Sequence, residues 1–191
     1  MSGMESAIVS ALIKQQNYTS LDQAKIRYGV HIILSELYKA IIVYGVALLL
    51  HCLVPTLIAH LTFLVLRQKS FGYHFAGKLS CIAWSIIAFP FLAAFLGIFQ
   101  LPYGLMLGIS MVSAIIIFAY APAGTLKHPI VNEKHRSYLK KHTRIRLLAI
   151  ILLIIVLPSS IQLFVVQGLC LQSLAILIQT IKGEDSNECK I

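Results

Sequence analysis

Charged residues are scarce in this 191-residue chain: Asp, Glu, Lys and Arg make up 12% of it, whereas hydrophobic residues make up 58%. A soluble domain has about 25% charged and about 45–50% apolar residues, so the composition excludes one. The runs 40–66, 79–126 and 147–181 contain no Asp, Glu, Lys or Arg at all. Each reaches the roughly 20 residues that cross a hydrocarbon core, which predicts an integral membrane protein.

Two further absences restrict the possibilities. The N-terminus lacks a basic region followed by an apolar stretch and a small-residue cleavage site, so we expect it to belong to the mature protein. The four cysteines, Cys52, Cys81, Cys170 and Cys189, form no CxxC pair and no disulfide-like spacing, so we expect free thiols and neither a metal nor a cofactor.

The pattern along the chain predicts an all-α fold, a polytopic membrane bundle in a single domain with an N-terminal amphipathic helix. Residues 1–39 contain that helix, over Ser20–Lys39, with Ser20 and Gln23 forming a capping box. It lies on the bilayer surface or packs on the bundle. The run 40–66 is either one span kinked at Pro55 or a hairpin. The remaining segments are a loop at 67–78, transmembrane helices at 79–99 and 103–121, a basic loop at 122–146, a transmembrane hairpin at 147–181 and a tail at 182–191.

The distribution of positive charge predicts the orientation in the membrane. Segment 67–78 carries Arg67, Lys69 and Lys78, segment 127–146 carries seven Lys and Arg residues against one Glu, and the turn 100–104 carries none. Basic loops stay in the cytoplasm, so both basic segments and the tail are expected there.

The stretch "FGYHFAGKLSC" at 71–81 interrupts the apolar pattern with a histidine and a cysteine. In an unbroken helix His74 and Cys81 would lie about 10.5 Å apart along the axis, beyond the roughly 2.6–3.2 Å of a nucleophile–base contact. The loop must therefore fold back, and Gly72 and Gly77 are the residue type that permits such a bend.

A helix that begins near Gly77 or Lys78 would place Cys81 in its first turn. There the helix dipole and unpaired amides favour a thiolate, and Lys78 and a protonated His74 add to the effect. The alternative is a buried structural cysteine beside a histidine at the membrane interface.

Two segments resemble those of one family. "LRQKSFGYHFAGKLSC" at 66–81 is similar to the signature of the accessory gene regulator B family, membrane-embedded cysteine endopeptidases of bacterial quorum sensing: a basic residue, then Gly-x-His, then a cysteine seven residues beyond the histidine. "YAPAGTLKHPI" at 120–130 resembles a second family motif, in which Gly124 stands where some relatives carry other small or acidic residues.

The resemblance implies that His74 is the base and Cys81 the nucleophile, with Arg67 and Gly72 supporting the site. It further implies a signalling-peptide precursor as substrate, with an amphipathic N-terminal segment and an acidic tail. Cleavage passes through a thioester on Cys81 and leads to a cyclic thiolactone. The chain would lie in a bacterial cell membrane with its active site at the cytoplasmic face.

The basic segment 134–146 suits contact with an acidic peptide or with anionic lipid headgroups, and Lys140, Lys141 and Arg144 are candidates for binding the substrate. The segment carries no nucleic-acid motif, so we expect no nucleic-acid partner. A homodimer is compatible with the sequence but does not follow from it.

Two other functions remain open. A small transporter or channel subunit could use His51, His60 and His74 as polar groups within the membrane, and a scaffold could bind partners through its amphipathic helix. Neither requires Cys81. His51 and His60 lie about 180° apart on a helix, so packing is expected for them rather than a shared metal.

Overall fold

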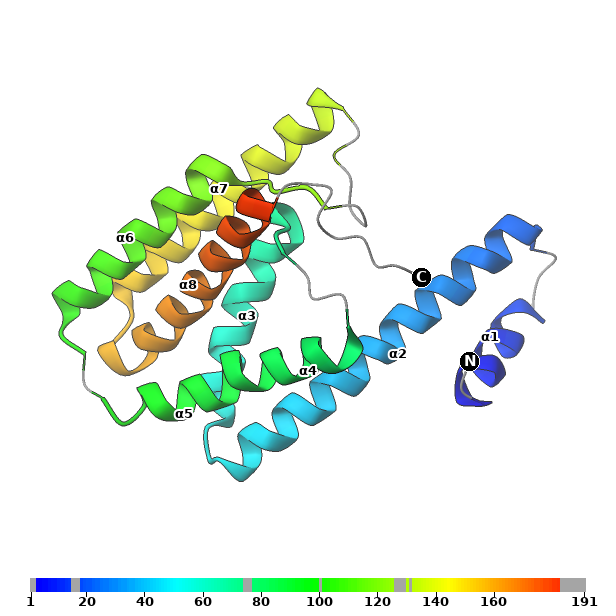
Figure 1. Ribbon diagram of the computed structural model, residues 1–191, viewed down its shortest axis with the longest axis horizontal. Coiled ribbons are helices and arrows are strands. Elements are labelled where there is room, and N and C mark those ends of the chain that lie inside the picture. Colours follow the sequence, from blue (N-terminus) through cyan, green and yellow to red (C-terminus); the bar gives the residue numbers. More distant parts are fainter. Residues whose placement is uncertain are drawn as a thin grey trace. The chain divides into compact units, whose positions relative to one another are not determined.

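The computed structural model describes residues 3–14, 18–73, 77–99, 101–125, 130 and 132–182. In these ranges all regular elements are helices (Figure 1), which confirms the predicted all-α class. The chain divides into two compact units, Met1–Gly45 and Val46–Ile191. Among the described residues four segments are long and apolar enough to cross a membrane, namely Ser20–Leu49, Leu79–Leu96, Tyr103–Tyr120 and Ser159–Lys182.

Unit 1 consists of α1, Gly3–Ile13, and the greater part of α2, Ser20–Leu49. The cap of α2 lies one residue earlier than the sequence predicted. Thr19 Oγ1 accepts from the backbone N–H of Asp22 at 3.3 Å and donates to the Asp22 carboxylate at 2.7 Å. The capping pair is therefore Thr19 and Asp22 instead of Ser20 and Gln23. The sequence predicted a boundary at Lys39 between a surface helix and the first apolar run. In the structure α2 continues through Lys39 without a break.

Within residues 40–66 the helix breaks before Pro55, at His51 and Cys52. His51, at φ 53°, ends α2 in the left-handed conformation, and the N–H of Cys52 donates to the carbonyl of Ala47 at 2.9 Å. This is the pattern of a Schellman motif. The next helix, α3, spans Leu53–Ser70. Pro55 lies in its first turn, where the missing N–H costs no hydrogen bond.

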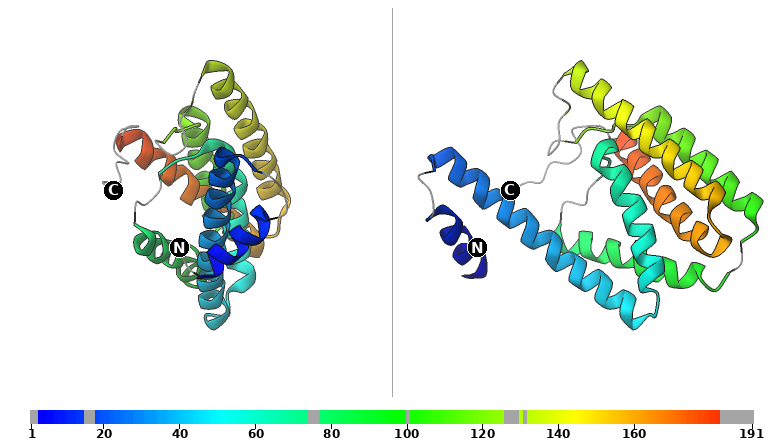
Figure 2. Two further views of the ribbon diagram at one scale, coloured as in Figure 1. Left: turned by 90° about the vertical axis from the view of Figure 1, so that its right-hand side faces the viewer. Right: turned by 180° about the vertical axis from the view of Figure 1, so that it is seen from behind.

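Unit 2 is organised around α8, Ser159–Lys182, which contacts α3 and α6 most extensively. Figures 1 and 2 show α6, Tyr103–Tyr120, and α7, Glu133–Val156, running beside α8, with α3 crossing this group. Twelve residues of α8 are buried, among them Gln162, Gln167 and Gln172. Polar side chains on the most buried helix of a membrane protein need partners within the bundle.

The expected transmembrane helix at 79–99 is interrupted at its centre. It comprises α4, Lys78–Ile86, a π-helical turn η1, Ile87–Phe91, and α5, Leu92–Leu96. Pro90 lies inside this turn and has no N–H to donate. Side chains from other elements bind the carbonyls there: Gln167 Nε2 donates to Ala88 O at 2.9 Å, and the Cys52 thiol donates to Pro90 O at 3.4 Å.

The basic segment differs from the expected loop at 122–146, because α7 begins at Glu133. Asn132 caps it, accepting from the backbone N–H of His135 at 2.7 Å. The hairpin expected over 147–181 consequently joins the apolar half of α7 to α8 at Leu157–Pro158. Charge on its first half leaves α7 outside the four candidate spans.

The crossing of α3 and α8 depends on Gly168, and it generates a stability prediction. A Cβ at this position would lie 2.3 Å from Ala59 O and 2.8 Å from Thr62 Cβ. Gly168→Ala must push the two helices apart, and we expect it to lower the free energy of unfolding by about 1–3 kcal/mol. Thermal unfolding in detergent micelles measures this loss.

Gly108→Ala is the matched control, because it places the same methyl group on α6 where nothing lies within 4 Å. We expect this variant to unfold at or above the wild-type temperature. Equal unfolding temperatures for the two variants would contradict the close approach at Gly168.

Candidate functional site

Cys81 lies in the first turn of α4, as the sequence predicted for a helix starting near Gly77 or Lys78. Gly77 is the residue before the helix, and the N–H of Cys81 donates to the Gly77 carbonyl at 3.0 Å, which closes the first turn. The thiol is free and half-buried. Because the Cα–Cβ bonds of a helix tilt toward its N-terminus, this side chain is directed back over the first turn.

The segment that precedes His74 in the chain is held in an irregular conformation. We call residues 70–73 the anchor segment. After α3 ends, Phe71 has φ 55° and Gly72 has φ 115°. The N–H of Gly72 donates to Ala123 O at 3.2 Å, and the N–H of Ala123 donates to Ser70 O at 3.0 Å, which forms a parallel bridge. The N–H of Tyr73 donates to Ala175 O in α8 at 2.9 Å.

This bridge joins the two motifs that carried the resemblance. The anchor segment belongs to the stretch 66–81, and Ala123 belongs to the stretch 120–130. Residues 121–125, which follow α6, are all buried. Two segments about 50 positions apart in sequence therefore pair with each other at one end of unit 2.

Arg67 binds the carbonyls of the anchor segment. It lies in the last turn of α3, and its Nη2 donates to Tyr73 O at 2.7 Å and to Gly72 O at 3.4 Å. The guanidinium also lies 5.3 Å from the centre of the Phe63 ring. Arg67 thus bridges the end of α3 and the backbone that leads to His74, a task that the planar guanidinium with its several donors suits.

Gly72 is required by its surroundings as well as by its backbone angles. A Cβ there would lie 3.2 Å from both the carbonyl carbon and the oxygen of Ala175, which belong to the backbone of α8. Gly77 differs, because its φ of −87° and ψ of 140° are open to any residue. The nearest atom to a Cβ at Gly77 would be the hydroxyl oxygen of Ser80, at 2.8 Å. Of the two glycines expected to provide the bend, only Gly72 has angles that demand glycine.

The remaining predicted site residues lie elsewhere or outside the description. His74 and the side chain of Lys78 lie outside the described residues. Lys140, Lys141 and Arg144 lie on α7, where Lys141 and Arg144 are exposed and Lys140 is half-buried. The Arg144 guanidinium lies 4.2 Å from the centre of the Phe118 ring, so this side chain also packs on α6.

The basic half of α7 lies against the end of α3 that leads into the anchor segment. Lys69 Nζ donates to the Tyr138 hydroxyl at 3.4 Å, and Arg146 Nη1 donates to Gln68 Oε1 at 3.1 Å. These contacts join α3 and α7 over 68–69 and 138–146. The positive charges of α7 are consequently at the same end of unit 2 as the anchor segment (Figure 1).

Sequence reasoning missed the part of the site that α8 contributes. The Gln172 amide donates to Phe71 O and to Ser70 Oγ, each at 2.7 Å, and Lys182 Nζ donates to the Tyr73 hydroxyl at 3.3 Å. One signal was available, since a glutamine within an apolar span has to bind something in the bundle. Its partner, about 100 residues away, has no local signature.

The other cysteines and histidines have structural surroundings. Cys52 is buried against the π-helical turn, Cys170 is half-buried in α8, and Cys189 lies outside the described residues. His51 is an exposed turn residue, and the ring centre of His60 lies 4.6 Å from that of Phe89. Within the described ranges no three His, Cys, Asp or Glu side chains gather to hold a metal ion.

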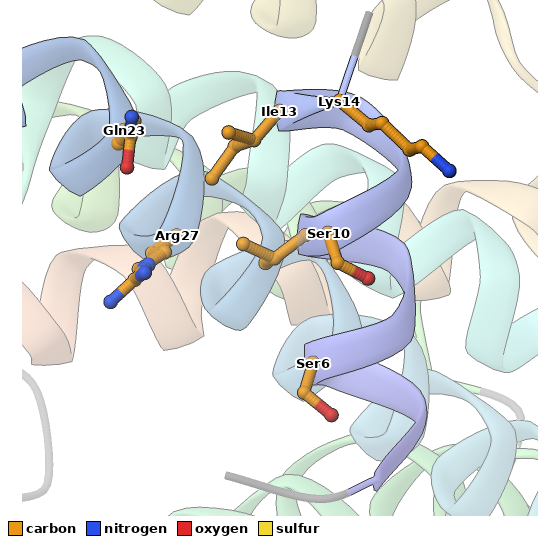
Figure 3. A pocket seen from close by; sticks show the side chains of 7 residues that line it. Ser6, Ser10, Ile13, Lys14, Gln23 and Arg27 are labelled. Atoms are coloured by element: carbon orange, nitrogen blue, oxygen red, sulfur yellow. The ribbon is translucent and has the colours of Figure 1, made fainter. Parts of the chain in front are cut away.

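Unit 1 has an open groove of about 560 Å³ between α1 and α2. Figure 3 shows Ile13 directed from α1 toward α2, where Gln23 and Arg27 lie. The groove is lined by Ser6, Val9, Ser10, Ile13, Lys14, Gln23 and Arg27. It contains neither a thiol nor an imidazole, so it offers no cysteine–histidine pair.

Comparison with known proteins gives a consistent result. The profile of the family Accessory gene regulator B matches residues 6–181. Accessory gene regulator protein B of Staphylococcus intermedius is 36% identical over 174 residues, covering 91% of this chain and 92% of that protein. The protein of the same name from Staphylococcus lugdunensis is 31% identical over 166 residues, covering 87% and 88%. No solved structure matches significantly. The chain therefore belongs to the accessory gene regulator B family.

Proposed function

We propose that this membrane protein is a cysteine endopeptidase that cleaves the C-terminal part of an autoinducing-peptide precursor for quorum sensing. The observation that carries the proposal is the joining of the two motifs at the bridge between Phe71 and Ala123. It fixes the backbone directly before His74, while Cys81 opens the next helix only seven residues later. Such a pair of imidazole and thiol is a nucleophile with its base.

The reaction follows from these two groups. His74 accepts the proton of the Cys81 thiol, and Sγ attacks the carbonyl carbon of the scissile peptide bond. The first-turn amides of α4, which have no helical acceptors, are available to donate to the negative oxygen. When the C–N bond breaks, the imidazolium returns its proton to the departing amine. The remaining acyl group is bound to Cys81 as a thioester.

The thioester has two fates. A cysteine thiol within the peptide can attack its carbonyl, which forms a thiolactone ring and returns the proton to the Cys81 sulfur. Water can attack instead and release a linear acid. Cys81 is half-buried, and a site that limits the access of water favours the ring.

The surroundings of the histidines speak for this function over transport. His51 ends a helix at the surface and His60 packs against an aromatic ring, so the described histidines do not line a common polar path. The positive charge of the 134–146 segment supports a site at the cytoplasmic face, because basic segments stay on that side by the positive-inside rule. The same segment offers positive charge to which an acidic precursor tail can bind.

Cys81 is expected to be the one cysteine that cleavage requires. Both Cys81→Ala and Cys81→Ser should abolish release of the C-terminal fragment, because neither retains a thiolate nucleophile. The chain with Cys52→Ser, Cys170→Ser and Cys189→Ser should remain active, since serine at position 52 keeps a donor for Pro90 O. Mass spectrometry of the cleaved precursor measures both. Cleavage by Cys81→Ala, or a folded but inactive triple variant, would overturn the proposal.

Substitutions of Gly72 and Gly77 by alanine are expected to differ in their effect on turnover. Gly72→Ala should lower kcat about tenfold, because a Cβ at positive φ strains the backbone by roughly 1–2 kcal/mol and also meets the backbone of α8. Gly77→Ala should turn over at nearly the wild-type rate, since its angles suit alanine. Single-turnover cleavage with the full chain in micelles tests this contrast. Equal rates for the two variants would show that the anchor segment tolerates a side chain.

Charge on α7 is expected to steer the precursor. Replacing Lys140, Lys141 and Arg144 with Gln should raise KM about tenfold and remove its salt dependence while kcat stays near wild type, because exposed charges accelerate encounter over about 8 Å at physiological salt. The variant with Lys140→Gln and Lys141→Gln alone keeps the contact of Arg144 with Phe118 and isolates the effect of charge. A precursor with a neutralised tail should be insensitive to all three substitutions. Efficient, salt-independent cleavage of both precursors would argue against steering.

A further inference from the structure

The side chain of Gln172 is buried in unit 2, and its amide binds the anchor segment. Its exposed fraction is 0%, and Nε2 donates to Phe71 O and to Ser70 Oγ. Among the described residues, its Oε1 has no hydrogen-bond partner. A buried amide oxygen without a hydrogen-bond partner lowers the stability of the fold. The hydrogen bonds that the amide nitrogen donates must offset this loss.

The bond to Phe71 O fixes one peptide unit from one side. Because Phe71 has φ 55°, its carbonyl is turned out of the α3 ladder and cannot be satisfied within that helix. The N–H of the same peptide unit belongs to Gly72 and donates to Ala123 O. The unit is therefore held at its oxygen by α8 and at its nitrogen by the 121–125 segment.

The two peptide units that follow are held in a similar way. Between Gly72 and Tyr73, the oxygen accepts from Arg67 and the nitrogen donates to Ala175 O. Tyr73 O, which belongs to the peptide unit that leads to His74, also accepts from Arg67. Gln172 thus makes the first of several hydrogen bonds that hold the backbone of the anchor segment before His74.

We propose that Gln172 is a positioning residue for the reaction: by orienting the peptide unit between Phe71 and Gly72, it sets the direction in which the chain leaves the anchor segment toward His74. This inference rests on the proposed function and deepens it. The side chain acts through backbone and touches no reacting atom. A residue of this kind changes turnover without changing how the substrate is first bound.

Gln172→Met is the decisive variant, because it keeps the length and volume of the side chain and removes both donors. The matched control is Gln162→Met on the same helix. Gln162 is also 0% exposed and also has an unpartnered Oε1, but its Nε2 donates to Ile154 O in α7 and not to the anchor segment. Both variants lose buried amide donors, and only one of them affects the backbone before His74.

The first readout is cleavage of a synthetic precursor by the full chain in micelles. We expect Gln172→Met to lower kcat about ten- to a hundredfold with KM unchanged, since a small misplacement of a catalytic group has an effect of that size. Gln162→Met should keep the wild-type kcat once the fraction of folded protein is taken into account.

The second readout needs no substrate. In the chain whose only thiol is Cys81, iodoacetamide alkylates that cysteine at a rate that varies with pH and reports on the neighbouring imidazole. We expect the pH profile of Gln172→Met to match that of His74→Ala, and the profile of Gln162→Met to match wild type. A purely structural role for Gln172 would not move this profile.

Three results would overturn the inference. These are a wild-type kcat in folded Gln172→Met, equal losses of kcat in Gln172→Met and Gln162→Met, and a wild-type alkylation profile in Gln172→Met. If Gln172→Met does not fold, Gln172→Asn takes its place under the same expectations, because it keeps a buried amide that is too short to reach Phe71 O. The proposed function itself fails on a different variant, an active Cys81→Ala chain, so the two failures are distinguishable.

Discussion

Backbone carbonyls that lose their helical partner inside an apolar bundle need another donor, because lipid offers none. In this protein α8 supplies it with glutamine amides. Ile154 O faces Pro158, which has no N–H four residues on, and Gln162 donates to it instead. Gln167 does the same for the π-helical turn and Gln172 for Phe71. These three irregularities, the bend before His74 included, are thereby tied to one central helix.

Local patterns explain why most of the fold could be predicted from the sequence. The apolar runs contain three of the four candidate spans, Leu79–Leu96, Tyr103–Tyr120 and Ser159–Lys182, whereas the fourth, Ser20–Leu49, begins in the segment expected to be an amphipathic helix. Cys81 at a helix start followed from the glycine at position 77. The prediction was wrong where a cap was overlooked: Asn132 starts α7 within a segment that was read as a loop because of its charge. The π-helical turn around Pro90 was also missed, since its carbonyl partners come from distant elements.

The candidate site could be predicted only as far as its residues are neighbours in sequence. Gly72 adopts φ 115°, a backbone conformation that its residue type permits, while the return of the loop toward Cys81 stays a prediction. The pairing of Phe71 with Ala123 depends on how α3 and α6 end in space, which no local pattern encodes. The contribution of α8 depends likewise on the close helix crossing that Gly168 permits. The contacts that the sequence did not predict are those between residues far apart in the chain, which depend on how the helices pack.

Within the described part of unit 2, the helix that carries Cys81 has few protein neighbours. Within unit 2, α4 packs chiefly on the turn that continues it, and Leu79 and Trp84 are 83% and 44% exposed. The span Leu79–Leu96 has 18 residues, about 27 Å of helix, which is slightly less than a typical hydrocarbon core of about 30 Å. A span shorter than the core does not gain from tilting, and it is accommodated by bilayer thinning, by snorkelling of flanking residues or by oligomerisation. The thickness of the surrounding bilayer therefore bears on the depth of α4 and, under the proposed function, on access to Cys81.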